Sequence, residues 1–264
     1  MTSAMTTGPA ARDTENHTPD SGDHGTDIHD TLPVVPVQDV PAVLSALDLF
    51  TRAHMGQLGS VSEFFHWKDR EQARSFLSAA GAALSGLPHH GSHGIHSPEI
   101  SDLARVCWDL LQVIRHEVHH DRPSARYTVL SNPPVRSSTT EPVLPKATRL
   151  GDGSIRLSLT PGQAESLLQA MHLYDTVLRG NLKALLTPAC RGLVNPGMAE
   201  AGFHIRKARE LMDPRPDEEF NALTKCLEMA FRPRPLKPAV FARIRPAAWK
   251  GNGPARASCP SCLK

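Results

Sequence analysis

The strongest constraint on the fold of this chain is an internal repeat. Residues 46–58 read ALDLFTRAHMGQL, and residues 170–182, which lie 124 positions later (170 − 46), read AMHLYDTVLRGNL. Four aligned pairs are identical: Ala46/Ala170, Leu49/Leu173, Gly56/Gly180 and Leu58/Leu182. Two more pairs, Phe50/Tyr174 and Gln57/Asn181, keep similar size and chemistry. The repeat predicts two copies of one small unit and indicates no particular reaction.

Each copy has the pattern of a strand followed by an amphipathic helix. Short β-like runs, 34–37 and 155–159, precede the two helices, and Thr160 to Gln163 has the form of a capping box, while Asp39 is a plausible N-cap for the first helix. A glycine inside or near each helix end is a candidate C-cap or close packing contact. Apolar positions step by three or four, as on one helix face: Val40, Val43, Leu47, Phe50, His54 and Leu58, then Ala164, Leu167, Met171, Tyr174, Leu178 and Leu182.

The rest of the chain predicts more helices and little strand. We expect helices over 67–84, from the N-cap Ser97 to about 121, over 196–212 and over 217–231, with a short strand at 127–130 and a linker over 137–145. The fold class is therefore α+β and mostly helical, with two related strand–helix units packed together. The expected divisions are an acidic disordered tail (1–32), a first unit (33–147), a reduced second unit (148–231) and a basic, proline-rich tail (232–264).

The composition of the tails and of the whole chain bounds the class of protein. Residues 1–32 hold six acidic side chains against one arginine, and residues 232–264 hold eight Lys or Arg and no acid. The sequence has no signal-peptide pattern and no apolar run long enough to span a membrane, and its five cysteines are scattered. These features predict a cytoplasmic protein with reduced thiols, no membrane partner and, from its Arg and Pro content, an actinobacterial type of genome.

One block resembles a known group of sequences. Residues 94–116, GIHSPEISDLARVCWDLLQVIRH, resemble a GIHSPE…ARxxxDLxQVIRH block of small uncharacterised proteins from phages, prophages and actinobacteria. Those proteins open with an LTxEQA…LYxRxxxGQ pattern, to which residues 159–185 are similar and residues 38–58 less so. The resemblance implies an origin in a mobile element or its bacterial host and implies no activity. It also singles out His96, which lies inside the block.

The segment His116-Glu-Val-His-His120 fits the H-E-x-x-H pattern of zinc hydrolases. On a helix this spacing places His116 and His120 one turn apart, with Glu117 as the base that activates a zinc-bound water. The predicted helix ends directly after the motif, no third ligand is identifiable, and the second copy has no counterpart. The alternative is a polar helix end whose imidazoles interact with the helix dipole.

Two other clusters, one of histidines and one of cysteines, could bind a metal ion or could be solvent-exposed residues with no ligand. The loop with His89, His90, His93 and His96 is typical of a solvated segment, although such tracts also bind metal. Cys259 and Cys262 form a single CxxC, which is half of a zinc knuckle, so they are either inert thiols or ligands of a zinc shared with another chain. No cofactor is expected, and zinc is the metal that the alternatives would require.

Nucleic-acid contact is the remaining candidate activity. Basic residues of the C-terminal tail, with Phe241 and Trp249 between them, could neutralise phosphates and stack on bases: Arg243, Arg245, Lys250 and Arg256. The alternative is a solvated linker or a tail that pairs with the acidic N-terminus. Asp48, Asp175 and Glu165 are interpreted as solvated residues on polar helix faces.

The leading hypothesis is a non-enzymatic binding or accessory protein. It depends on the repeat and on the lack of a complete catalytic motif in the sequence. A protein partner or self-association is expected, because a duplication allows pairing about a pseudo-two-fold axis. The nucleic-acid-associated protein and the zinc-dependent hydrolase remain the two alternatives.

Overall fold

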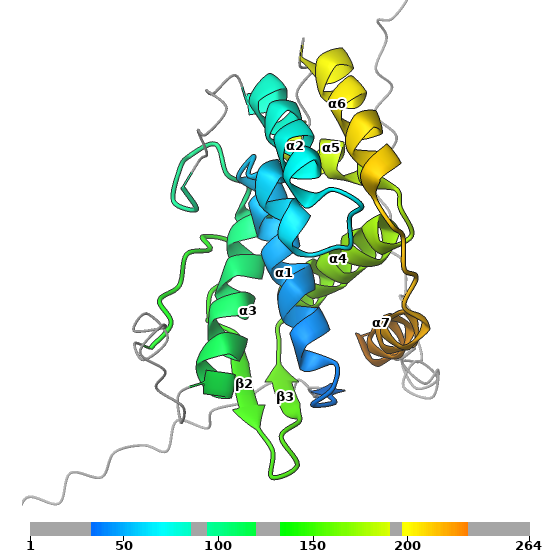
Figure 1. Cartoon of the computed structure of the whole chain (residues 1–264). Coiled ribbons are helices and arrows are strands. Elements are labelled where there is room, and N and C mark those ends of the chain that lie inside the picture. Colours follow the sequence, from blue (N-terminus) through cyan, green and yellow to red (C-terminus); the bar gives the residue numbers. More distant parts are fainter. Residues whose placement is uncertain (1–32, 86–93, 120–132, 191–196, 232–264) are drawn as a thin grey trace, which may run out of the picture.

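The computed structural model describes residues 33–85, 94–119, 133–190 and 197–231. It confirms the α+β class with a helical majority (Figure 1). The predicted tails and the predicted strand at 127–130 lie outside the described residues. In chain order the elements are β1 (Val34–Val35), α1 (Val40–His54), η1 (Leu58–Glu63), α2 (Arg70–Ser85), α3 (Asp102–His119), β2 (Lys146–Arg149), β3 (Ile155–Ser158), α4 (Pro161–Leu178), η3 (Leu182–Leu185), α5 (Leu186–Cys190), α6 (Met198–Leu211) and α7 (Glu218–Phe231), where η denotes a 3-10 helix.

The sheet joins the two units. Its order is β1-β3-β2, and β3 is antiparallel to both neighbours, with Val35 opposite Ile155 and Ala147 opposite Leu157. The strand β2 was not predicted, because its sequence KATR lacks a run of β-branched or aromatic residues. It forms because the turn at Gly153, with a φ of 85°, folds it back onto β3.

The two copies of the repeat end in the same way. Gly56 and Gly180 have φ angles of 75° and 88°, which only glycine adopts without strain. After them, the amide of Gln57 donates to the carbonyl of Arg52 (2.9 Å), and the amide of Asn181 donates to that of Thr176 (3.1 Å). Both pairs are the long-range bond of a Schellman motif, so the glycine C-cap expectation is confirmed in both copies.

The repeat continues into the following helices. A 3-10 helix begins at Leu58 and again at Leu182. The next helices, α2 and α6, pack against each other and correspond at an offset of 128 (209 − 81). At that offset the buried positions coincide: Ala73/Ala201, Leu77/Ile205, Ala80/Ala208 and Leu84/Met212. The duplicated unit is therefore longer than the thirteen residues that reveal it in the sequence.

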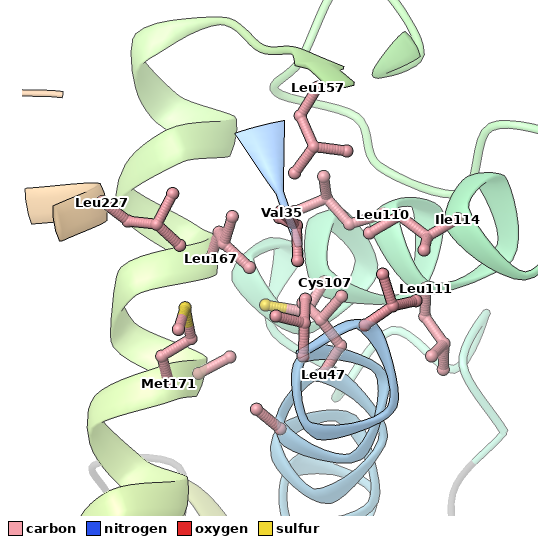
Figure 2. Close-up of a cluster of buried hydrophobic side chains, with 14 of the residues drawn as sticks. Val35, Leu47, Cys107, Leu110, Leu111, Ile114, Leu157, Leu167, Met171 and Leu227 are labelled. Carbon is pink, nitrogen blue, oxygen red and sulfur yellow. The ribbon is translucent and has the colours of Figure 1, made fainter. Parts of the chain in front are cut away.

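The two units bury their apolar faces together. One cluster joins β1, α1 and α3 to β3, α4 and α7, and Figure 2 shows Leu47, Leu110 and Met171 among its members. A second cluster joins α1, η1 and α2 to α4, η3 and α6. Each cluster draws on both halves of the chain, so each unit supplies part of the surface that covers the other.

Helix α3 begins later than predicted. Ser97 is not its N-cap, because residues 97–100 form a turn in which the amide of Ile100 donates to the carbonyl of Ser97 (3.0 Å). Ser101 takes the capping role, and its Oγ accepts from the amide of Ala104 (3.3 Å). The predicted capping box of α4 is confirmed at Thr160 and Gln163. Asp39 lies at the N-cap position of α1 but makes no side-chain capping bond.

Two aspartates of α3 anchor the segment predicted as a linker. Asp109, which is 1% exposed, accepts from the amides of Ser137 (2.7 Å) and Ser138 (3.0 Å) and from the Ser138 hydroxyl (2.8 Å). Two turns earlier and nearer solvent, Asp102 accepts from the amides and hydroxyls of Thr139 and Thr140. Residues 137–140 thus have no regular secondary structure but are held against α3.

Asp102 is expected to make stability depend on acid pH. Burial opposes its ionisation, but the hydrogen bonds from Thr140 and Thr139 outweigh this and lower its pKa from 3.8 to about 2. Its contribution to the free energy of unfolding is complete above pH 3.8 and is lost as the pH falls through about 2. In thermal melts near neutral pH, Asp102→Asn should have a lower melting temperature than the wild type. This difference should disappear as the pH falls from 3.8 to about 2. A difference that stays constant down to pH 2 would contradict this assignment; Glu165→Gln, at an exposed position of α4, is the control.

Candidate functional site

A cavity of about 600 Å³ lies where α1, η1 and α3 meet. Its walls are mainly polar, with apolar patches from Leu44 and Phe64. The charged side chains come from three elements, so the tertiary fold assembles the cavity. The described residues that line it are Leu44, Ser45, Asp48, Arg52, Glu63, Phe64, Arg115 and His119.

Asp48 organises this cavity. It is only 7% exposed, and its two oxygens bind different guanidinium groups: Oδ1 accepts from Arg52 Nε (2.8 Å) and Oδ2 from Arg115 Nη2 (2.9 Å). The interpretation of Asp48 as a solvated residue is therefore wrong. The helix spacing did not reveal its burial because α3 covers that face of α1. Asp175 is also partly buried and bound to Arg179, whereas Glu165 is exposed as expected.

Helical spacing explains how each element presents its residues. Leu44, Asp48 and Arg52 follow one another at intervals of four along α1, and Arg115 and His119 do so along α3, which places each set on one helix face. Ser45 is held nearby, where its hydroxyl donates to the carbonyl of Pro41 (2.9 Å).

The two arginines retain hydrogen-bonding capacity toward the cavity. Of the five N–H donors on a guanidinium, Arg115 uses one for Asp48, and Arg52 uses one for Asp48 and one, at 3.5 Å, for Gln57. Asp48 orients both guanidinium groups. Their remaining N–H donors are therefore held in place, and they form no hydrogen bond within the described part of the chain. A guanidinium in this state suits a carboxylate or phosphate, which it binds through paired N–H bonds.

The cavity includes one end of the HEVHH segment but not its predicted ligand pair. His119 lines the cavity, while His116 is a half-buried residue of the same last turn and His120 lies outside the described residues. Glu117 Oε1 accepts from the amide of Arg149 (2.8 Å), which links α3 to β2. One oxygen of Glu117 is thus used by the fold, and the zinc hypothesis stays an untested prediction.

Of the other predicted site residues, the structure describes only His96, which does not line this cavity. His96 is exposed in the turn before α3. Arg243, Arg245, Lys250, Arg256, Cys259 and Cys262 lie outside the described residues, as do His89, His90 and His93. Over 33–85, 94–119, 133–190 and 197–231, no three His, Cys, Asp or Glu side chains are grouped as metal ligands. Sequence reasoning missed Arg52 and Arg115, whose signal was their i, i+4 spacing from Asp48 and His119.

Comparison with known proteins adds no relative. No family model, curated protein or solved structure matches the chain. Among the described helices, none combines the length and the apolar character needed to cross a membrane.

Proposed function

We propose that this protein is a non-enzymatic binding protein and that the cavity between α1, η1 and α3 receives a small ligand with an anionic group. One observation carries the proposal: a buried carboxylate, Asp48, fixes two guanidiniums at the wall of one cavity while most of their N–H donors stay unspent. Because the two arginine side chains are already held in place, less conformational entropy is lost when a ligand binds.

The charge and shape of the cavity narrow the ligand. Asp48 carries one negative charge between two positive ones, so these three residues sum to +1, and Glu63 adds one negative charge elsewhere in the lining. Leu44 and Phe64 offer contacts to a hydrocarbon portion, and Glu63 can accept a hydrogen bond from a donor such as an amine. This set fits a small carboxylate or amino acid, or the chain end of a peptide partner.

The proposal keeps the wider context drawn from the sequence. Binding a ligand or a partner suits an accessory role in a mobile element or its actinobacterial host, in the cytoplasm. Glu117 accepts from the amide of Arg149 in β2, and the Ser45 hydroxyl donates to the carbonyl of Pro41. Both side chains already serve the fold, which supports binding over hydrolysis.

The proposal is tested on the full chain with a thermal-shift and calorimetry series in low-salt buffer. The probes are citrate, L-glutamate and succinate. At least one should raise the melting temperature in a saturable way, and Arg115→Met should weaken its binding at least ~10-fold, since a charge-assisted pair is lost. Arg70→Met, at an exposed position of α2, should change nothing.

Two results would overturn the proposal. One is that no probe binds the wild-type protein. The other is that Arg115→Met, shown by circular dichroism to be folded, binds as tightly as the wild type.

A further inference from the structure

A second cavity, of about 320 Å³, lies at the end of α4 where η3 meets α6. It shares no lining residue with the first. Among the described residues that line it, none is acidic and four have cationic side chains: Arg179, Lys183, Arg206 and Arg209. Arg179 donates to Asp175 (2.9 Å), whereas the other three take part in no ion pair within the described part of the chain.

The duplication shows that these cations are a difference between the two units. The offsets of 124 and 128 place them opposite Met55, Gly59, Ser78 and Gly81. In the first unit, the two glycines among these positions lie in close contacts that leave no room for a larger side chain. A Cβ on Gly81 would lie 2.6 Å from the carbonyl oxygen of Gly56, and one on Gly59 would lie 2.2 Å from the Ser78 hydroxyl.

At the corresponding positions of the second unit, charged side chains occupy this contact. The guanidinium of Arg209 lies over Gly180, where a Cβ would meet it at 2.7 to 2.9 Å. Gly180 thus serves its helix as a C-cap and also leaves room for Arg209. Lys183, Arg206 and Arg209 stand where the first unit has the small residues Gly59, Ser78 and Gly81, and the cavity lies between these cations.

The apolar contacts of the duplicated helices do not require these charges. The buried residues Ile205 and Ala208 of α6 match Leu77 and Ala80 of α2, so the two units keep the same packing while only the second gains the cations. Lys183, Arg206 and Arg209 are exposed and form no ion pair among the described residues, so solvent weakens their mutual repulsion but no acidic side chain there cancels it. An anion with several oxygens would relieve that repulsion and accept from several of the side chains at once.

From this arrangement we propose that the cavity formed by Arg179, Lys183, Arg206 and Arg209 binds a phosphate group. The ligand is either a free phosphate compound or the backbone of a single-stranded nucleic acid. All four side chains belong to the described part of the chain, so the proposed site does not use the basic C-terminal residues 232–264. It is also independent of the anion-binding cavity at Asp48.

The experiment measures binding of pyrophosphate and of a twelve-residue oligothymidylate to the full chain by calorimetry at low salt. Wild-type protein should bind at least one of them saturably, and Arg206→Gln and Arg209→Gln should each weaken that binding about 10-fold. Lys207→Gln is the matched control, because Lys207 lies between them on α6, pairs with Glu210 (3.1 Å) and does not line the cavity.

Each outcome decides the proposal. Binding of pyrophosphate lost in the arginine variants supports a free phosphate compound, and the same loss for the oligonucleotide alone supports a nucleic-acid backbone, with affinity falling as salt rises. Binding that survives in both variants places the phosphate elsewhere, such as on the C-terminal tail, and overturns the proposal. Absence of binding to either probe also overturns it. Arg115→Met should leave this binding unchanged, which separates the result from that of the first cavity.

Discussion

Asp109→Ala is expected to lower the free energy of unfolding by about 3 kcal/mol. The carboxylate is 1% exposed and accepts three hydrogen bonds from Ser137 and Ser138. Alanine would leave two backbone amides without their acceptor, one of them at the buried Ser138, and buried unsatisfied donors are costly. The segment 137–140 would also lose half of its attachment to α3, because only the Asp102 bonds would remain.

Urea denaturation followed by circular dichroism measures this loss. Asp109→Asn should fall between the wild type and the alanine variant, because an amide offers one acceptor oxygen where the carboxylate offers two. Glu165→Ala, at an exposed position of α4, is the control and should stay within about 0.5 kcal/mol of the wild type. A loss below about 1 kcal/mol for Asp109→Ala would show that the 137–140 segment does not depend on this carboxylate.

Leu58→Ala and Leu182→Ala should each lower the free energy of unfolding by about 2–5 kcal/mol. The two leucines are 0% and 1% exposed, begin equivalent 3-10 helices and belong to the same buried cluster. Each substitution removes buried methyl groups and leaves a cavity that rigid neighbours cannot fill. Because the positions are equivalent in the two copies, the two losses should be of similar size.

The same urea titrations compare the two variants with Met229→Ala, whose side chain is 65% exposed on α7. That control should be nearly neutral. If one leucine variant is strongly destabilised and the other behaves like the control, the two copies do not carry equivalent parts of the core.

Much of the secondary structure could be predicted because it depends on local patterns. The three-and-four spacing from Val40 to Leu47 and from Leu167 to Tyr174 places both duplicated helices correctly. Thr160 and Gln163 mark a helix start because capping involves residues three positions apart. The start of α3 was misplaced, since Ser97 and Ser101 are both capable of capping and only the turn at 97–100 selects the second.

The candidate site could be predicted far less well. The HEVHH motif indicates His116 and His120 as ligands, whereas among the described residues of that segment His119 is the one that lines the cavity. Asp48 looked like a solvated residue because nothing near it in sequence indicates that Arg115, on another helix, would bind it. Pairings between residues 67 positions apart depend on how helices pack.

The sequence by itself determined the repeat, the helical majority and the glycines that end the duplicated helices, since period, capping and backbone conformation are local properties. Only the tertiary structure decided that the units share their core, that Asp48 fixes two arginines at one cavity, and that four cations of the second unit surround another. The reason is that burial and charge pairing depend on which faces meet. Two copies with the same apolar pattern can therefore carry different polar residues where their helices meet.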